Sequence, residues 1–266
     1  MQVPQLVVTI TNARYALNAA NAKRTPAARA AERKRMVDLA GQEALANGIT
    51  TFVDAGSDFG TIDYFKDLES KKALPLRLYV MVRTSNDQLT KNLARYRMVA
   101  DTNDYLVVRS IKLSIDGALG SHGAWLLNPY NDLPTSVGLA TTQPKAVDAT
   151  AKLAIANGFQ LNVHAIGDRA NREVLDIFER TFKANPSKKD LRWRIEHAQH
   201  LHPADIPRFG KLGVIAAMQG VHATSDGPWV DKKLGAERVK NGAYVWRALM
   251  KTGAIIANGT DVPVED

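Results

Sequence analysis

Polar side chains suited to metal binding close three apolar, strand-like segments of the chain. His164 ends the run 161–163, His197 follows residues 194–196, and Asp261 comes shortly after residues 255–258. Imidazole nitrogens and carboxylate oxygens bind divalent metals, and a bound metal with an open position can activate water. A lone histidine in such a place is more often a hydrogen-bonded core residue. Three such residues, all at strand ends, favour a hydrolytic metal centre.

Lys112 is a fourth candidate because it lies inside the mostly apolar run 107–115. A lysine that points into a protein interior must be paired, neutral or modified, since an unpaired buried charge is costly. One solution is a carboxylated lysine, whose carbamate can bridge two metal ions. The other is an ion pair with a nearby carboxylate such as Asp116 or Asp54. The residues alone leave both interpretations open.

The segments that must position these residues alternate between strand-like and helix-like patterns. The predicted strands cover residues 49–54, 76–82, 107–115, 159–164, 191–197, 213–219 and 254–258. The predicted helices cover residues 27–46, 62–72, 87–100, 144–157, 171–182, 203–211 and 236–251, and a long loop covers 116–139. Residues 5–10 could form a further strand, although nothing in the sequence indicates a partner for it.

Such alternation predicts an α/β protein with a parallel sheet and right-handed crossovers. Polar residues at the ends of many strands favour a TIM-type (β/α)₈ barrel over a doubly wound sheet, which would carry a glycine-rich phosphate turn after an early strand. A complete barrel has eight strands and the pattern yields seven. We therefore expect an incomplete barrel, with residues 1–266 forming one domain.

Composition narrows the function classes. The net charge is +8, but the basic segments 23–35, 77–109 and 183–194 contain interspersed alanines and acids without regular aromatic residues, which is typical of solvated helix faces rather than a nucleic-acid surface. No apolar run approaches the roughly 18 residues of a membrane helix, and no signal peptide is visible. With no cysteine, a disulfide framework and a zinc–thiolate site are excluded. A cytoplasmic location is expected, although the absence of cysteine also fits a periplasmic one; a homo-oligomer is possible.

The chain resembles the YtcJ-like group of metal-dependent hydrolases in the amidohydrolase superfamily. Seven motifs carry the resemblance in the expected order. They are residues 48–51, 111–121, 129–139, 164–170 (His-Ala-Ile-Gly-Asp-Arg-Ala), 195–199 (Ile-Glu-His-Ala-Gln), 218–226 and 259–264.

The resemblance implies a role for each matching residue. Lys112 corresponds to the metal-bridging lysine of the fourth barrel strand, and His164 and His197 to the ligands of the fifth and sixth strands. Asp261 corresponds to the eighth-strand aspartate, which binds metal and acts as the general base. Substrate contacts are expected from the loop after the seventh strand, at Gln219, His222, Asp226 and Trp229. Asp168 and Arg169 are expected to brace the mouth of the site.

One departure from the family pattern concerns the first strand, which ends in His-X-His in the superfamily. Here His-X-His occurs only at residues 200–202, after the predicted sixth strand, where it cannot take that role. The chain therefore resembles a fragment that contains barrel strands two to eight and lacks the family's terminal β-sandwich.

Two functions follow as hypotheses. The first is a hydrolase that attacks carbon–nitrogen bonds of small molecules (amide, N-acyl or cyclic amide) with metal-activated water and Asp261 as base. Zinc is the expected metal, as one or two ions, although manganese and iron also suit nitrogen and oxygen ligands. The alternative is a non-catalytic truncated barrel with weak or no metal binding.

Overall fold

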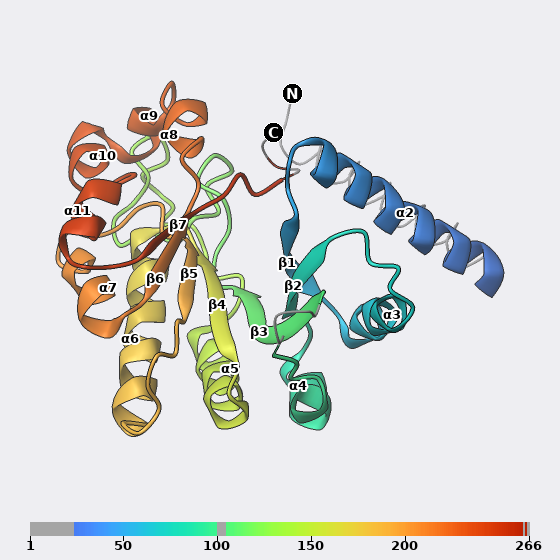
Figure 1. The fold of residues 1–266 in the computed structure, drawn as a ribbon. Coiled ribbons are helices and arrows are strands. Elements are labelled where there is room, and N and C mark those ends of the chain that lie inside the picture. The colour runs from blue at the N-terminus through green and yellow to red at the C-terminus, as the bar shows by residue number, and fades with distance from the viewer. Residues whose placement is uncertain (1–23, 100–104, 263, 265–266) are drawn as a thin grey trace.

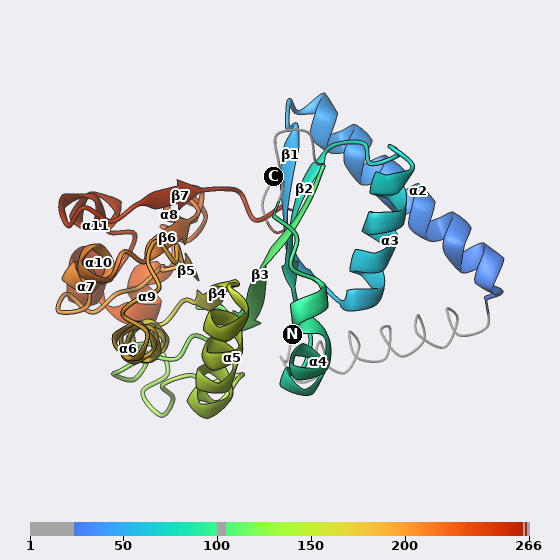
Figure 2. The same cartoon turned by 60° about the horizontal axis from the view of Figure 1, so that its bottom comes forward.

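A computed structural model describes residues 24–99, 105–262 and 264. Seven strands form one sheet in the order of the chain, and every neighbouring pair is parallel. The strands are β1 (Thr51–Ser57), β2 (Arg77–Val82), β3 (Leu106–Ser114), β4 (Gln160–Ala165), β5 (Arg194–His197), β6 (Ile215–Met218) and β7 (Ile256–Asn258). The sheet curls so that helices cover its outer, convex side (Figures 1 and 2).

The sheet is a half-barrel. Within the described residues β1 and β7 each have only one neighbouring strand, so they remain the two edges of the sheet. This arrangement confirms the predicted α/β fold, an incomplete TIM-type barrel. The chain after β7 leaves the sheet and runs toward β1 (Figures 1 and 2).

Helices connect the strands and begin and end at residues suited to those positions. The main helices are α2 (Pro26–Ala46), α3 (Phe59–Ser70), α4 (Asn86–Asn92), α5 (Pro144–Asn157), α6 (Asp168–Ala184) and α7 (Ile206–Leu212). Thr25 caps α2, because its side chain accepts a hydrogen bond from the Ala28 amide at 3.2 Å. Gly158 ends α5 with a φ of 69°, a left-handed conformation that glycine adopts without strain.

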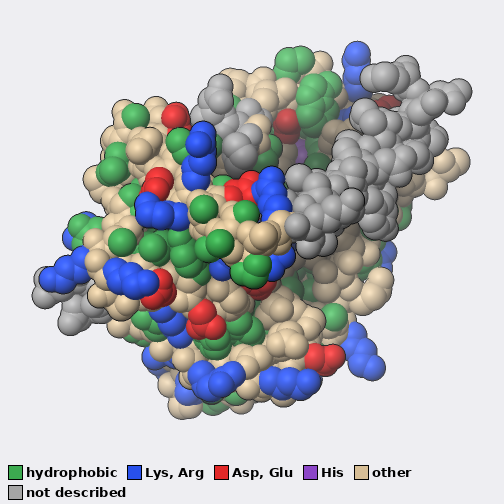
Figure 3. All heavy atoms as spheres, turned by 90° about the vertical axis from the view of Figure 1, so that its right-hand side faces the viewer, with side chains coloured by type: hydrophobic (Ala, Val, Ile, Leu, Met, Phe, Trp, Pro, Cys, Tyr) green, Lys and Arg blue, Asp and Glu red, His purple; other side chains and the backbone are tan. Residues whose placement is uncertain are grey.

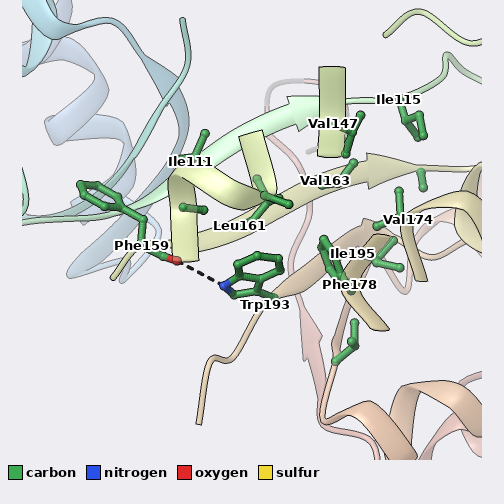
Figure 4. Packing of buried hydrophobic residues seen from close by; sticks show 14 of the residues in the cluster. Ile111, Ile115, Val147, Phe159, Leu161, Val163, Val174, Phe178, Trp193 and Ile195 are labelled. Atoms are coloured by element: carbon green, nitrogen blue, oxygen red, sulfur yellow. Dashed lines mark hydrogen bonds between the residues drawn. The ribbon is translucent and has the colours of Figure 1, made fainter. Parts of the chain in front are cut away.

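The main core lies between the convex side of the sheet and helices α5 and α6. Alternate residues of β4 point outward, so that Leu161 and Val163 pack in one cluster with Phe178 of α6 and with Trp193 (Figure 4). The Trp193 indole N–H donates to the Phe159 carbonyl at 3.2 Å, which satisfies the polar atom of a fully buried side chain. The opposite residues of the same strands are thereby turned toward the inside of the half-barrel.

Two predicted helices are wrong in extent. The helix expected over 87–100 ends at Asn92, is followed by a 3₁₀ turn at Leu93–Arg95, and gives way to an antiparallel bridge between Met98 and Val108. Both backbone hydrogen bonds of that bridge form, at 2.8 and 3.0 Å, and they replace the helical ones. The predicted strand at 5–10 lies outside the described residues.

The helix expected over 236–251 is two helices, α10 (Ala236–Gly242) and α11 (Trp246–Lys251). Between them Tyr244 adopts a left-handed backbone with a φ of 52°. Its amide donates to the Gln199 carbonyl at 3.1 Å and its hydroxyl to Asp226 at 2.7 Å. These contacts with residues far away in the chain outweigh the local helical pattern.

On the face drawn in Figure 3, basic and acidic side chains are interspersed over the described surface. Across residues 24–99, 105–262 and 264, no helix combines the length and the apolar character needed to span a bilayer.

Candidate metal centre

The carboxyl ends of β3, β4 and β5 bring three of the predicted ligands to the same edge of the sheet. Ser114 is paired with His164 across β3 and β4, and Ala165 is paired with His197 across β4 and β5. The two imidazole rings meet edge to face, with centroids 4.4 Å apart and an interplanar angle of 73°. Lys112 lies two residues before the end of β3. Three of the four candidate ligands therefore lie at one edge of the sheet.

Lys112 is buried, with 6% of its surface exposed. Its ammonium group has one hydrogen bond, to the Leu113 carbonyl at 3.4 Å, and no carboxylate oxygen of the described residues lies within 4.0 Å of it. Burial lowers the pKa of Lys112 to about 8, and the charge of Glu196 opposes this shift. With this pKa roughly a tenth of the amine is neutral at pH 7 and about half at pH 8.

An ion pair of Lys112 with Asp116 or Asp54, which the sequence left open, is not found. Asp54 accepts hydrogen bonds from the Ser57 hydroxyl at 2.5 Å and from the Gly56 amide at 3.3 Å, within its own turn. Asp116 accepts from three backbone amides instead. Both carboxylates are occupied locally or by the backbone, so neither neutralises the lysine.

Asp116 holds the turn that follows His164. Its Oδ1 accepts from the Ile166 amide at 3.0 Å, and its Oδ2 accepts from the amides of Gly167 at 2.8 Å and Trp125 at 2.9 Å. The buried Nε2 of His164 lies 3.4 Å from Asp116 Oδ1, without hydrogen-bond geometry. A methyl group on Gly167 would lie 2.0 Å from the Trp125 carbonyl, so this close approach requires glycine. The loop after β3 is thus clamped onto the end of β4.

His197 is held by Gln219. Its Nδ1 lies 2.7 Å from the Gln219 Oε1, in the turn after β6. Burial, with smaller contributions from His164 and Lys112, holds the pKa of His197 well below its usual value, so the ring is neutral at pH 7. His197 and Ala198 have φ values of 74° and 40°, a left-handed backbone that is strained in residues other than glycine. Strain of this kind is common at functional sites.

The residues predicted to contact substrate follow β6. The His222 ring lies parallel to that of His197, with centroids 5.8 Å apart. Asp226 is buried and accepts from the Gln199 amide at 2.5 Å and from the Tyr244 hydroxyl. Trp229 is half-buried, and its ring lies against Gly120 in the loop after β3. His222 and Trp229 therefore keep partly exposed surface, whereas Gln219 and Asp226 bind other protein groups.

Asp261 lies beyond the end of β7 and is exposed, with a φ of 62°. Its backbone carbonyl accepts from the Val264 amide at 2.9 Å. It is close enough for its charge to raise the pKa of Lys112. Within the described residues, however, no hydrogen bond joins its side chain to Lys112 or to the two histidines. Of the four predicted ligands, Asp261 is the one whose side chain makes no direct hydrogen bond to the other three among the described residues.

The supporting residues predicted at the mouth have defined contacts. The Asp168 carboxylate accepts from the Leu127 amide at 2.8 Å and from the Arg169 amide. The Arg169 guanidinium stacks over the Trp125 ring at 4.6 Å. Both residues thus connect the start of α6 to the long loop, in agreement with a bracing role.

Two charged residues near the site were not singled out from the sequence. Arg194 and Glu196 of β5 form an ion pair of 2.8 Å, and Glu196 is the charge that most strongly opposes the shift of Lys112. Ile195 between them is part of the core. Because side chains alternate along a strand, this burial of Ile195 turns both neighbours to the inside of the half-barrel. The alternation of polar and apolar residues at 194–197 is a signal that could have found them.

The candidate ligands at this edge of the sheet meet the requirements of a divalent metal site in part. In the part of the chain that the structure describes, no three histidine, aspartate or glutamate residues are close enough together to hold an ion. Two neighbouring imidazoles are present, however, and a lysine of lowered pKa lies near them. Among the described residues the buried Nε2 of His164 has no hydrogen-bond partner. These groups fit a metal centre in type and burial, and Lys112 and Asp261 would have to complete it.

Comparisons with known proteins agree with this description. The sequence model of the amidohydrolase family matches residues 8–266. The chain is 36% identical over 247 residues to the protein LONG AFTER FAR-RED 3 of Arabidopsis thaliana, covering 88% of this chain and 42% of that protein. It is 34% identical over 161 residues to the putative amidohydrolase YtcJ of Bacillus subtilis, covering 60% and 30%.

Among solved structures, an uncharacterized metal-dependent hydrolase from Pyrococcus furiosus superimposes with a TM-score of 0.74 at 27% identity, covering 88% of this chain and 47% of that one. A second, from Pyrococcus horikoshii, gives 0.73 at 28% identity, covering 85% and 44%. The chain spans less than half the length of each of these relatives. The match of the family model over nearly the whole sequence shows that this chain belongs to the amidohydrolase family.

Proposed function

We propose that this chain contributes to the active site of a metal-dependent hydrolase that cleaves carbon–nitrogen bonds in amides, N-acyl groups or cyclic amides. The observation that carries the proposal is the meeting of Lys112, His164 and His197 at the ends of three adjacent parallel strands. Family membership supports hydrolysis as the reaction. The substrate is a small molecule.

His164, His197, Lys112 and Asp261 would hold the metal, with zinc as the first candidate and manganese or iron as alternatives for this donor set. When bound, a divalent ion lowers the pKa of water toward about 7 and polarises a carbonyl. Burial of Lys112 favours its neutral amine, which can attack carbon dioxide. That step forms an N–C bond and releases one proton, and the carbamate oxygens of Lys112 would then be available to hold the metal.

Asp261 is assigned the general base. Its carboxylate takes a proton from the attacking water and then delivers it to the leaving nitrogen as the carbon–nitrogen bond breaks. Its exposure on the segment that follows β7 suits a group that must reach both water and substrate. His222 and Trp229 would contact substrate directly, whereas Gln219 and Asp226 would shape the pocket through His197 and Tyr244.

Two observations favour the alternative, a non-catalytic half-barrel with weak or no metal binding. Among the described residues no three histidine or carboxylate side chains lie close enough together to hold an ion, and the two edge strands of the sheet each have only one neighbouring strand. The free backbone N–H and C=O groups of an edge strand can pair with a strand of another chain. Elemental analysis of the purified chain separates the two functions. Stoichiometric zinc together with hydrolysis of an N-acyl or cyclic amide supports the enzyme, and inactive protein without metal supports the alternative.

The role of Asp261 is tested by Asp261→Asn. Loss of a general base typically lowers turnover by about 10²- to 10⁴-fold, and we expect such a loss with most of the metal retained. Asp190→Asn is the control, because Asp190 is an exposed carboxylate that forms an ion pair with Arg192. Unchanged turnover in Asp261→Asn would contradict the assignment.

A further inference from the structure

Gln219 was expected to contact substrate, but its side chain is used inside the protein. It is 8% exposed, and both ends of its amide have partners. The Nε2 donates to the Ala217 carbonyl at 3.3 Å, and the Oε1 lies 2.7 Å from Nδ1 of His197. The carbonyl of Ala217 can only accept, so the amide nitrogen must face it. The Gln219 oxygen is therefore turned toward the imidazole.

This orientation decides where the proton of the neutral ring lies. The amide oxygen has no hydrogen to donate, so a hydrogen bond to it requires a hydrogen on Nδ1 of His197. The single ring proton is then at Nδ1, and Nε2 keeps its lone pair. Metal-binding histidines commonly donate their second ring nitrogen to a fixed acceptor, which sets the tautomer and the orientation of the ring.

We propose that Gln219 is a positioning residue that holds His197 in its Nδ1–H tautomer and so presents Nε2 to a divalent metal ion. The inference rests on the proposed function for the identity of the ligand, but the tautomer is a property of the metal-free chain. Through the Ala217 carbonyl, the orientation of the ring depends on β6, the strand next to that of His197.

His164 offers a contrast within the same site. Its Nε2 lies 3.4 Å from a carboxylate oxygen of Asp116 without hydrogen-bond geometry, so among the described residues no hydrogen bond fixes the position of a proton on that nitrogen. The proton position is better defined on His197, because a hydrogen bond with good geometry joins its Nδ1 to the Gln219 oxygen.

The test is a long-range ¹H–¹⁵N spectrum of the histidine rings in the metal-free 266-residue chain at pH 8. This pH is well above the ordinary histidine pKa of about 6.5, so a neutral ring is observed. The six histidines are assigned by single substitutions. We expect the His197 signals of the Nδ1–H form, and a spectrum of the Nε2–H form would overturn the proposal.

Three variants show whether Gln219 determines the tautomer of His197. Gln219→Met removes the acceptor at similar volume, so His197 should shift to the Nε2–H form or to a mixture, and zinc affinity should fall about 10- to 100-fold. Gln219→Glu keeps an acceptor oxygen and should keep the tautomer. Gln160→Met is the matched control, because Gln160 is equally buried at 8% and its amide bonds to Tyr79 and to a backbone carbonyl instead of a histidine.

The outcomes separate this inference from the proposed function. An unchanged His197 spectrum in Gln219→Met, or the same shift in Gln160→Met, would refute the positioning role. If Gln219→Met fails to fold, the wild-type spectrum and Gln219→Glu still decide the question. If the wild-type tautomer is as expected but the chain takes up no zinc, the positioning role stands and the metal-dependent activity of this chain fails.

Discussion

The rings of His164 and His197 meet edge to face at 4.4 Å between centroids, although a complete helix and a loop separate the two residues in the chain. The contact exists because β4 and β5 are adjacent and parallel, so their carboxyl ends share one edge of the sheet. It places two imidazoles within reach of a single ion.

If the two rings bind the same ion, their contributions to metal affinity are not additive. His164→Ala and His197→Ala should each weaken zinc binding by more than about tenfold, which is 1.4 kcal/mol. The double variant should lose little more, since one lost ligand already breaks the site. Competition titration with a zinc chelator measures this, and His202→Ala is the control. Losses that add in full would mean that the histidines bind separately.

Lys112 should make the stability of the metal-free chain depend on pH. Its pKa is about 8 when folded and 10.5 when unfolded, so the unfolded state binds more protons between these values and stability rises with pH there. Below pH 8 both states are protonated, and the buried charge costs on the order of 3 kcal/mol. Lys112→Met should therefore stabilise the chain at pH 7, with a gain that disappears toward pH 10.5.

Urea unfolding in buffer free of carbon dioxide measures this effect, because carboxylation would change the charge of Lys112. Lys91→Met on α4 is the control, since Lys91 is exposed. A gain that is equal at pH 7 and pH 10.5 would show that the burial of the charge is not its cause.

Asp116 should matter for stability far more than another aspartate of the same loop. Asp116→Asn turns an NH₂ group toward backbone amides that now donate to a carboxylate, and it should cost about 3 kcal/mol. Asp132→Asn removes partly exposed contacts with Lys233 and His122 and should cost less than about 1 kcal/mol. Urea midpoints compare them, and equal small losses would contradict the clamp.

His200 should contribute to unfolding in acid. It is 3% exposed, neither ring nitrogen has a hydrogen-bond partner among the described residues, and burial lowers its pKa to about 3. The unfolded histidine titrates near 6.5, so the stability that His200 supports is complete above pH 6.5 and is lost as the pH falls toward 3.

His200→Leu should remove this dependence and reduce the loss of stability between pH 7 and 5 by about 2 kcal/mol. His202→Leu, two residues further along the chain, serves as the control for a histidine that is only partly buried. Unfolding curves at the two pH values measure the effect. Equal losses of folding stability between pH 7 and pH 5 in wild type and His200→Leu would rule out His200 as the source of the acid sensitivity.

Several features were predictable because they depend on residues close together in the chain. The alternation of strand-like and helix-like segments indicated the order of strands and helices. The positions of Lys112, His164 and His197 near strand ends followed from that order. The limits of α4 and the break between α10 and α11 did not, because the Met98–Val108 bridge and the contacts of Tyr244 outweigh helical periodicity there.

By itself, then, the sequence determined a parallel (β/α) architecture and the strand ends at which the candidate ligands lie, since side-chain periodicity and turn residues act locally. Only the tertiary structure decided that Lys112 has no carboxylate partner among the described residues, that Asp116 clamps the loop after β3 onto the end of β4, and that Gln219 binds His197 rather than standing open to substrate. Each of these depends on which groups from separate strands come within hydrogen-bonding distance, and local patterns do not encode such distances.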